Sequence, residues 1–101
     1  MARRTHEETA IAKRALMDAI EHNELSLGEA VRRMRKITGM NQKAYAERIV
    51  GIAPRILAEI ERDLGNPTLE TLDKIGRPFG YTVGFVPRQD AHCGRRKKSS
   101  D

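Results

Sequence analysis

Tryptophan is absent from this chain of 101 residues, which also holds only two tyrosines, two phenylalanines and one cysteine. The single cysteine, Cys93, excludes a disulfide within the chain and suits a reducing compartment. So few aromatic rings argue against single-stranded nucleic acid as a ligand, because proteins that bind it stack bases on aromatic side chains. No apolar run approaches the roughly 18 residues of a membrane span, and the charged first residues lack the apolar core of a signal peptide. We therefore expect a cytoplasmic protein without a membrane partner.

Side chains that could carry catalysis or hold a cofactor are also sparse. The three histidines, His6, His22 and His92, fall near the start of the chain, at the end of an expected helix and in an expected tail. No Ser/His/Asp or Cys/His set recurs in an expected structured segment, and His92 with Cys93 is too small a set for a tetrahedral metal site. No glycine-rich phosphate loop is present. We predict that the protein is not an enzyme and needs no cofactor or metal.

Positive charge is concentrated in two segments of this chain, whose formal net charge is +5. Residues 27–62 hold eight basic and four acidic side chains, and residues 88–101 hold five basic and two acidic ones. The other two segments, 1–26 and 63–87, each carry a net charge of −1. A basic central block and a basic tail indicate an anionic partner, of which nucleic acid is the commonest.

The length of 101 residues predicts a single domain.

Hydrophobic periodicity and capping residues predict five helices. A Ser or Thr followed three residues later by Glu forms a capping box before each of the first two helices. Asn41, Pro54 and Thr68 mark the starts of the other three. The expected helices span residues 6–22, 27–38, 42–50, 54–63 and 69–79.

After Gly80 the helical period gives way to alternation. Tyr81, Val83 and Phe85 alternate with smaller residues up to Pro87, which is typical of a short strand. A lone strand leaves its backbone N–H and C=O groups unpaired, so we expect it to pair with the same strand of a second copy across a two-fold axis. The alternative is an extended segment that packs on the helices of its own chain.

A series of short motifs covers about half of the chain. Its members are Gln42, Lys43, Tyr45, Ala46, Gly51, Ile52, Leu57, Ile60, Glu61, Arg62 and the run from Asn66 to Leu72. In this order and near this spacing, they resemble the XRE family of helix-turn-helix regulators, which includes the phage repressors and Cro proteins. The small Ala46 lets two helices cross closely, and Gly51 lets the chain turn sharply between them. The resemblance implies an all-α, lambda-repressor-like fold whose helix at about 54–62 enters the major groove.

The resemblance also implies roles for single residues. Arg35 and Glu61 match a buried structural ion pair that ties the family's first helix to the recognition helix. Gln42 matches a residue that bridges phosphate and the recognition helix. Arg55 can donate two hydrogen bonds to guanine, the commonest specific contact in the major groove, while Arg62 is better placed for phosphate. The complete set of DNA-binding candidates is Gln42, Lys43, Pro54, Arg55, Ile56, Glu59, Arg62 and Asn66.

Two departures from the family pattern bear on this site. The stretch between Ala46 and Gly51 is one residue longer than the family norm, which affects the turn. The expected recognition helix is also poor in polar side chains. Ile56 either contacts a thymine methyl group or belongs to the core, and Glu59 either repels phosphate or accepts a hydrogen bond from a cytosine amino group.

The end of the chain, from Asn66 to Val86, is similar to HipB-type antitoxins, in which a short strand follows the last helix and pairs between protomers. Those antitoxins repress their own operon and hold a kinase-like toxin. We therefore expect a homodimeric, sequence-specific repressor that binds double-stranded DNA near its own promoter, in the nucleoid of a bacterial or phage-type host. The alternative is an antitoxin or protein-binding module whose main partner is a toxin protein.

These expectations divide the chain into four parts. They are an N-terminal capped helix extension (1–26), a helix-turn-helix DNA-binding domain (27–80), a C-terminal dimerisation strand (81–87) and a disordered basic tail (88–101) that adds phosphate attraction.

Overall fold

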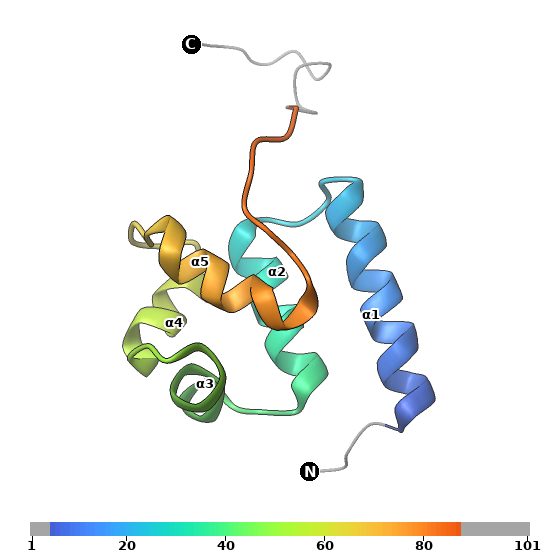
Figure 1. Ribbon diagram of the computed structural model, residues 1–101, viewed down its shortest axis with the longest axis horizontal. Helices are drawn as coiled ribbons and strands as arrows, with labels where there is room; N and C mark the ends of the chain where they lie inside the picture. Colours follow the sequence, from blue (N-terminus) through green and yellow to red (C-terminus); the bar gives the residue numbers. More distant parts are fainter. Residues whose placement is uncertain (1–4, 88–101) are drawn as a thin grey trace.

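The computed structural model describes residues 5–87, which form a set of short helices packed around one core (Figure 1). The all-α class predicted from the sequence is confirmed. The helices are α1 (His6–Glu21), α2 (Leu27–Thr38), α3 (Gln42–Ala44) with its π-helical continuation η1 (Tyr45–Val50), α4 (Pro54–Glu61), α5 (Leu69–Gly76) and the 3₁₀ turn η2 (Arg77–Phe79). The predicted basic tail, with His92 and Cys93, lies outside the described residues.

Local signals in the sequence determine where these helices begin. Both predicted capping boxes are present: Thr5 and Glu8 exchange backbone-to-side-chain hydrogen bonds of 3.0 Å before α1, and Ser26 pairs in the same way with Glu29 before α2. The Asn41 side chain accepts a hydrogen bond from the Ala44 N–H at 2.8 Å and so caps α3. These side chains satisfy N–H groups that a helix start leaves without partners.

The core takes buried side chains from α1, α2, η1, α4 and α5. The most deeply buried are Leu16 of α1, Val31 of α2, Tyr45 of η1, Leu57 of α4 and Ile75 of α5. Each is at most 2% exposed, so every one of these helices depends on the others for its apolar contacts. The helices therefore support one another, and α4 gains its fixed position from this shared core.

The extra residue before the turn is absorbed by the π-helical segment η1. Its Gly51 N–H donates to the Ala46 carbonyl at 2.7 Å, five residues earlier, and Gly51 adopts a φ of +80° that glycine tolerates. A π-turn accommodates one additional residue without ending the helix. Tyr45 and Ala46 consequently stay fully buried, and the chain still turns at Gly51 as the family pattern requires.

The start of α2 lies directly against the end of α4. The Asp63 carboxylate accepts hydrogen bonds from the Gly28 N–H at 2.7 Å and from the Ser26 hydroxyl at 2.8 Å. A Cβ atom added to Gly28 would lie 2.6 Å from the Ile60 carbonyl oxygen and 2.7 Å from that of Glu61. Only glycine allows the two backbones to approach this closely.

The predicted strand at Tyr81–Val86 is wrong for the single chain. Residues 81–87 are extended, but none of residues 5–87 forms a strand. The physical reason is that a strand needs a partner, and the rest of the described chain is helix or turn. The segment 81–87, which we call the arm, runs from the end of η2 past α2 and then away from the helices (Figure 1). Pairing of two arms across a dimer stays a prediction.

Replacement of Gly28 by alanine tests the α2–α4 contact. Because the new methyl group would meet two backbone oxygens rather than flexible side chains, we expect Gly28→Ala to lower the free energy of unfolding by about 2–3 kcal/mol. Urea denaturation followed by circular dichroism measures the change. Gly84→Ala is the matched control, since nothing lies within 4 Å of a Cβ at that position. Equal stability of the two variants would contradict the close packing.

Candidate nucleic-acid interface

A buried carboxylate at the end of α4 joins three helices. Glu61 is 2% exposed and forms a two-pronged ion pair with Arg35 of α2, with nitrogen–oxygen distances of 2.7 and 3.0 Å. The Gln42 side-chain amide, at the start of α3, donates to the same carboxylate at 3.0 Å. The structure thus brings together the two residues expected to form the structural ion pair, and it adds Gln42 to them. We call Arg35, Gln42 and Glu61 the buried polar cluster.

Two further hydrogen bonds complete this cluster. The Arg35 guanidinium also donates to the Met40 carbonyl at 3.1 Å, and Arg32 donates to the Glu61 carbonyl at 3.2 Å. Arginine can make this set of contacts because its guanidinium carries several donors in one plane. Both the loop before α3 and the last turn of α4 are therefore fastened to α2.

The hydrogen bonds of the cluster keep Glu61 ionised. Burial alone would raise the pKa of its carboxyl group, but the hydrogen bonds from Arg35 and Gln42, together with the positive charges of Arg35 and Arg32, lower that pKa below its ordinary value. The carboxylate is therefore charged at neutral pH. It serves as a fixed acceptor between the helices, which is how a buried charge is tolerated.

Tyr45 brings an unsatisfied polar atom close to this cluster. The residue is fully buried, and its hydroxyl group has no hydrogen-bond partner among the described residues. Burial and the nearby negative charge of Glu61 raise the pKa of this hydroxyl to about 12, although the positive charge of Arg35 opposes them. The aromatic ring of Tyr45 packs in the core, but its hydroxyl group adds no hydrogen bond to that packing.

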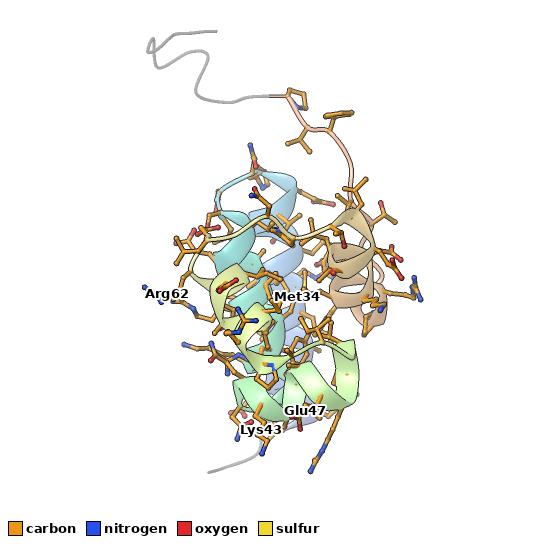
Figure 2. All side chains as sticks on the ribbon, turned by 90° about the vertical axis from the view of Figure 1, so that its left-hand side faces the viewer. Met34, Lys43, Glu47 and Arg62 are labelled. Carbon is orange, nitrogen blue, oxygen red and sulfur yellow. The ribbon has the colours of Figure 1, made fainter. Side chains whose placement is uncertain are left out.

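The opposite side of α4 faces solvent, and exposed candidate DNA-binding residues lie on it and on the segments next to it. Arg55 projects from the first turn of α4 with 77% of its side chain exposed, and Arg62 is exposed where the helix ends. Lys43 is exposed on the neighbouring α3, and Asn66 is exposed in the loop after α4. Figure 2 faces these helices and shows Lys43 and Arg62 reaching outward, whereas Met34 lies within the protein. Four polar or basic candidates are therefore accessible.

Glu59 pairs with Arg55 along the exposed side of α4. The Arg55 guanidinium lies 3.5 Å from the Glu59 carboxylate, in the i,i+4 arrangement that neighbouring helix turns allow. The two side chains are 77% and 40% exposed, so solvent screens the pair and its contribution to stability is small. The pair nevertheless places an acceptor and a donor side by side on one helix face.

Two apolar candidates point at least partly inward. Ile56 is half-buried and packs against the core, which favours the core alternative that the sequence left open for it. Pro54 is partly buried at the first turn of α4, where its missing N–H group leaves no lost hydrogen bond. The structure therefore separates these two residues from the accessible polar set.

Comparison with known proteins identifies the arrangement of α3, η1 and α4. A family model described as "Helix-turn-helix" matches residues 31–86, which is more than half of the chain. The chain belongs to the XRE-type helix-turn-helix family. The match leaves α1 outside and includes most of the arm.

One curated relative shows the same similarity over a shorter range. It is named an uncharacterized HTH-type transcriptional regulator of Haemophilus influenzae and is 40% identical over 53 residues. That range covers 52% of this chain and 53% of the relative, so the chain spans about half the length of the relative that it matches. No solved structure matches the chain.

In helix-turn-helix terms, α3 and η1 form the first helix of the motif and α4 forms the second, which in this motif is called the recognition helix. The turn between them contains Gly51, and Ala46 of the first helix is fully buried. Glu61 thus anchors the last turn of the recognition helix from its inner side, and Arg55 occupies its outer side near the beginning. The N-terminal part of a recognition helix is the part that meets base edges.

Sequence reasoning missed Asp63 and the full extent of the buried polar cluster. Asp63 lies in the turn after α4 with a φ of +59°, and its hydrogen bonds reach residues 35 and 37 positions earlier in the chain. No local pattern marks such a contact.

Other kinds of site find no support in the described part of the chain. Among residues 5–87, no three or more His, Cys, Asp or Glu side chains lie together as metal ligands would. No helix in that range is long and apolar enough to cross a membrane.

A double-variant experiment tests the buried polar cluster. Arg35→Met leaves the Glu61 charge buried without its partner, so we expect it to cost about 3–5 kcal/mol of stability. Arg35→Met combined with Glu61→Leu removes both charges, and it should be more stable than Arg35→Met alone. Chemical denaturation of the wild type, both single variants and the double variant measures this coupling. Additive losses would show that the two side chains do not act as a pair.

A second variant tests the unsatisfied hydroxyl group. Tyr45→Phe keeps the ring in the core and removes a buried donor without a partner, so we expect the free energy of unfolding to rise by about 1 kcal/mol. Thermal and urea unfolding should agree on the sign. A loss of 1 kcal/mol or more would mean that the hydroxyl makes a stabilising bond.

Proposed function

We propose that this protein is a homodimeric repressor that binds a double-stranded DNA operator of approximate two-fold symmetry near its own promoter. The observation that supports this best is the position of α4. Its inner side is held by the core and the buried polar cluster, and its outer side presents Arg55 to solvent. A B-DNA major groove, about 12 Å wide, admits one helix.

In this proposal Arg55 reads sequence and its neighbours position the helix. Arg55 donates two hydrogen bonds to guanine O6 and N7, and Glu59, one turn later, accepts from the amino group of a neighbouring cytosine. Lys43 and Arg62 contact phosphates on the two sides of the groove, while Asn66 supports the backbone contacts from the following loop. Pro54 and Ile56 act at most through apolar contact with the groove, because both are partly covered by the protein itself.

Gln42 links phosphate binding to the recognition helix. It occupies the first position of α3, where N–H groups favour a phosphate oxygen, and its side-chain amide already contacts Glu61 at 3.0 Å. A phosphate bound at this helix start would therefore lie one hydrogen bond away from the end of α4. Since residues 27–62 carry a net charge of +4, long-range attraction brings the same surface toward DNA.

Two copies are needed for a specific site, because one recognition helix contacts only a few base pairs. A two-fold dimer of the phage-repressor kind would place its two recognition helices one turn of DNA apart, about 34–36 Å. The arm supports such a dimer: apart from the Tyr81 N–H, which donates to the Gly76 carbonyl, its extended backbone is not paired in a strand within the described chain. Repression would follow from occupation of the promoter.

Binding to two DNA duplexes tests the proposed function. We expect the full chain to prefer a labelled duplex from immediately upstream of its gene over a scrambled duplex, at low and at near-physiological salt. Arg55→Ala should weaken binding to the upstream duplex about tenfold or more and should affect the scrambled duplex much less, because it removes a base contact. Lys43→Ala should instead weaken binding to both duplexes and reduce the salt slope by about one.

Arg14→Ala is the matched control for these variants. Arg14 is exposed on α1, which lies on the other side of α2 from α4 (Figure 1), so this change removes the same charge outside the proposed interface. Binding that is equal for both duplexes, and that Arg55→Ala and Arg14→Ala alter alike, would contradict base reading. That result would favour the antitoxin alternative, in which the helix-turn-helix domain mainly holds a toxin protein.

A further inference from the structure

An open apolar groove lies between the helices and the arm. It has a volume of about 300 Å³ and is lined mostly by carbon atoms of α1, α2, α5 and the arm itself. Its walls include Ile20, Val31, Leu72, Ile75, Tyr81 and Val83. A groove of this composition gains free energy when apolar groups displace its water.

The arm also carries an aromatic side chain that contacts nothing in its own chain. Phe85 is 107% exposed, more than any other large apolar residue in the described part of the protein. It does not line the groove, although its neighbours on both sides, Gly84 and Val86, do. Figure 1 shows the end of the arm running away from the helices. The protein therefore exposes both an apolar groove and an aromatic ring to solvent.

We propose that the groove of each protomer is filled by Phe85 of a second copy. This inference rests on the homodimer in the proposed function and names the contact that holds it together. In a two-fold assembly both copies present a groove and a ring, so the contact is made twice and closes on itself. No partner other than this chain needs to be assumed.

The size of the groove fits this occupant. A cavity of roughly 150 Å³ lined by aliphatic and aromatic side chains is large enough to bind benzene in a protein core. The groove exceeds that volume, and a phenylalanine side chain adds only one carbon to a benzene ring. Burial of a phenylalanine typically removes about 150–250 Å² of surface from water, so two such insertions contribute strongly to a small interface.

Antiparallel pairing of the two arms would place Phe85 of one copy beside the groove of the other copy. If the two-fold axis passes beside Val83, the residue opposite Phe85 is Tyr81 of the partner subunit, and paired residues project from the same face. Tyr81 and Val83 are both groove residues. The arm from Tyr81 to Pro87 contains no charged side chain, so two arms do not repel each other.

Sedimentation equilibrium of the full chain tests the contact. We expect the wild type to form dimers and Phe85→Ala to raise the dimer dissociation constant at least tenfold, as loss of a central aromatic contact does. Because Phe85 has no intrachain contacts, the variant should fold normally, and circular dichroism checks this. Ile11→Ala is the matched control: Ile11 is a large apolar residue of α1, 63% exposed and not part of the groove. It should leave the dissociation constant unchanged.

Nuclear magnetic resonance distinguishes the possible occupants of the groove. In dimers mixed from labelled and unlabelled chains, isotope-filtered spectra should show contacts between the Phe85 ring of one copy and the Val31, Leu72 or Ile75 methyl groups of the other. Contacts only within one chain would mean that the arm folds back, and they would overturn the inference.

The outcomes also separate this inference from the proposed function. A wild type that stays monomeric at all concentrations would overturn both the homodimer and the groove contact. A wild-type dimer that Phe85→Ala leaves equally tight would overturn the groove contact alone, and the homodimeric repressor would stand.

Discussion

The ion pair between Arg35 and Glu61, together with the apolar core, fixes which side of α4 faces inward. Glu61 ends α4 with a carboxylate that is almost fully removed from water, and such a charge is tolerated only where donors surround it. Those donors come from α2 and from the start of α3, so the three helices meet at one carboxylate. Any rotation of α4 about its own axis would break these bonds. The outward direction of Arg55 is thus a consequence of the inward direction of Glu61.

The same constraint means that the packing of α4 depends little on the residues of its outer side. Leu57, Ile60 and Glu61 fix the inner side of the helix through the core and the buried polar cluster. Arg55 and Glu59 form only a solvent-screened pair, and their exchange for other residues would disturb little of the packing. The additional residue within η1 shows a similar separation, because the π-turn absorbs it while Tyr45 and Ala46 remain buried. In the proposed function, base contacts and structural support therefore come from opposite sides of one helix.

The sequence predicted most of the helical fold because its signals are local. Capping residues such as Thr5 and Ser26, the apolar spacing within each helix and the position of Gly51 each act within a few residues, and the helix bounds follow them closely. The Arg35–Glu61 contact was expected only through the family resemblance, since nothing local connects positions 26 residues apart.

The features that the sequence did not predict depend on contacts between segments far apart in the chain, which no local sequence pattern indicates. Alternation at Tyr81–Val86 predicted a strand, but alternation indicates only an extended backbone, and a strand also needs a partner. The hydrogen bonds of Asp63 to Ser26 and Gly28, the unsatisfied hydroxyl of Tyr45 and the groove beside the arm all arise from packing between distant segments. Among the DNA-binding candidates, burial separated Ile56 from Arg55, which the sequence alone could not do.

The most direct measurement is a titration of the isotope-labelled protein with the upstream duplex, followed residue by residue through its backbone amide resonances. The account predicts that the largest changes fall at the start of α3, around Gln42 and Lys43, and along α4 from Arg55 to Arg62. Residues of α1 should change little. Changes confined to the tail after residue 87, with α3 and α4 unaffected, would contradict the central claim that α4 is held in place to read DNA.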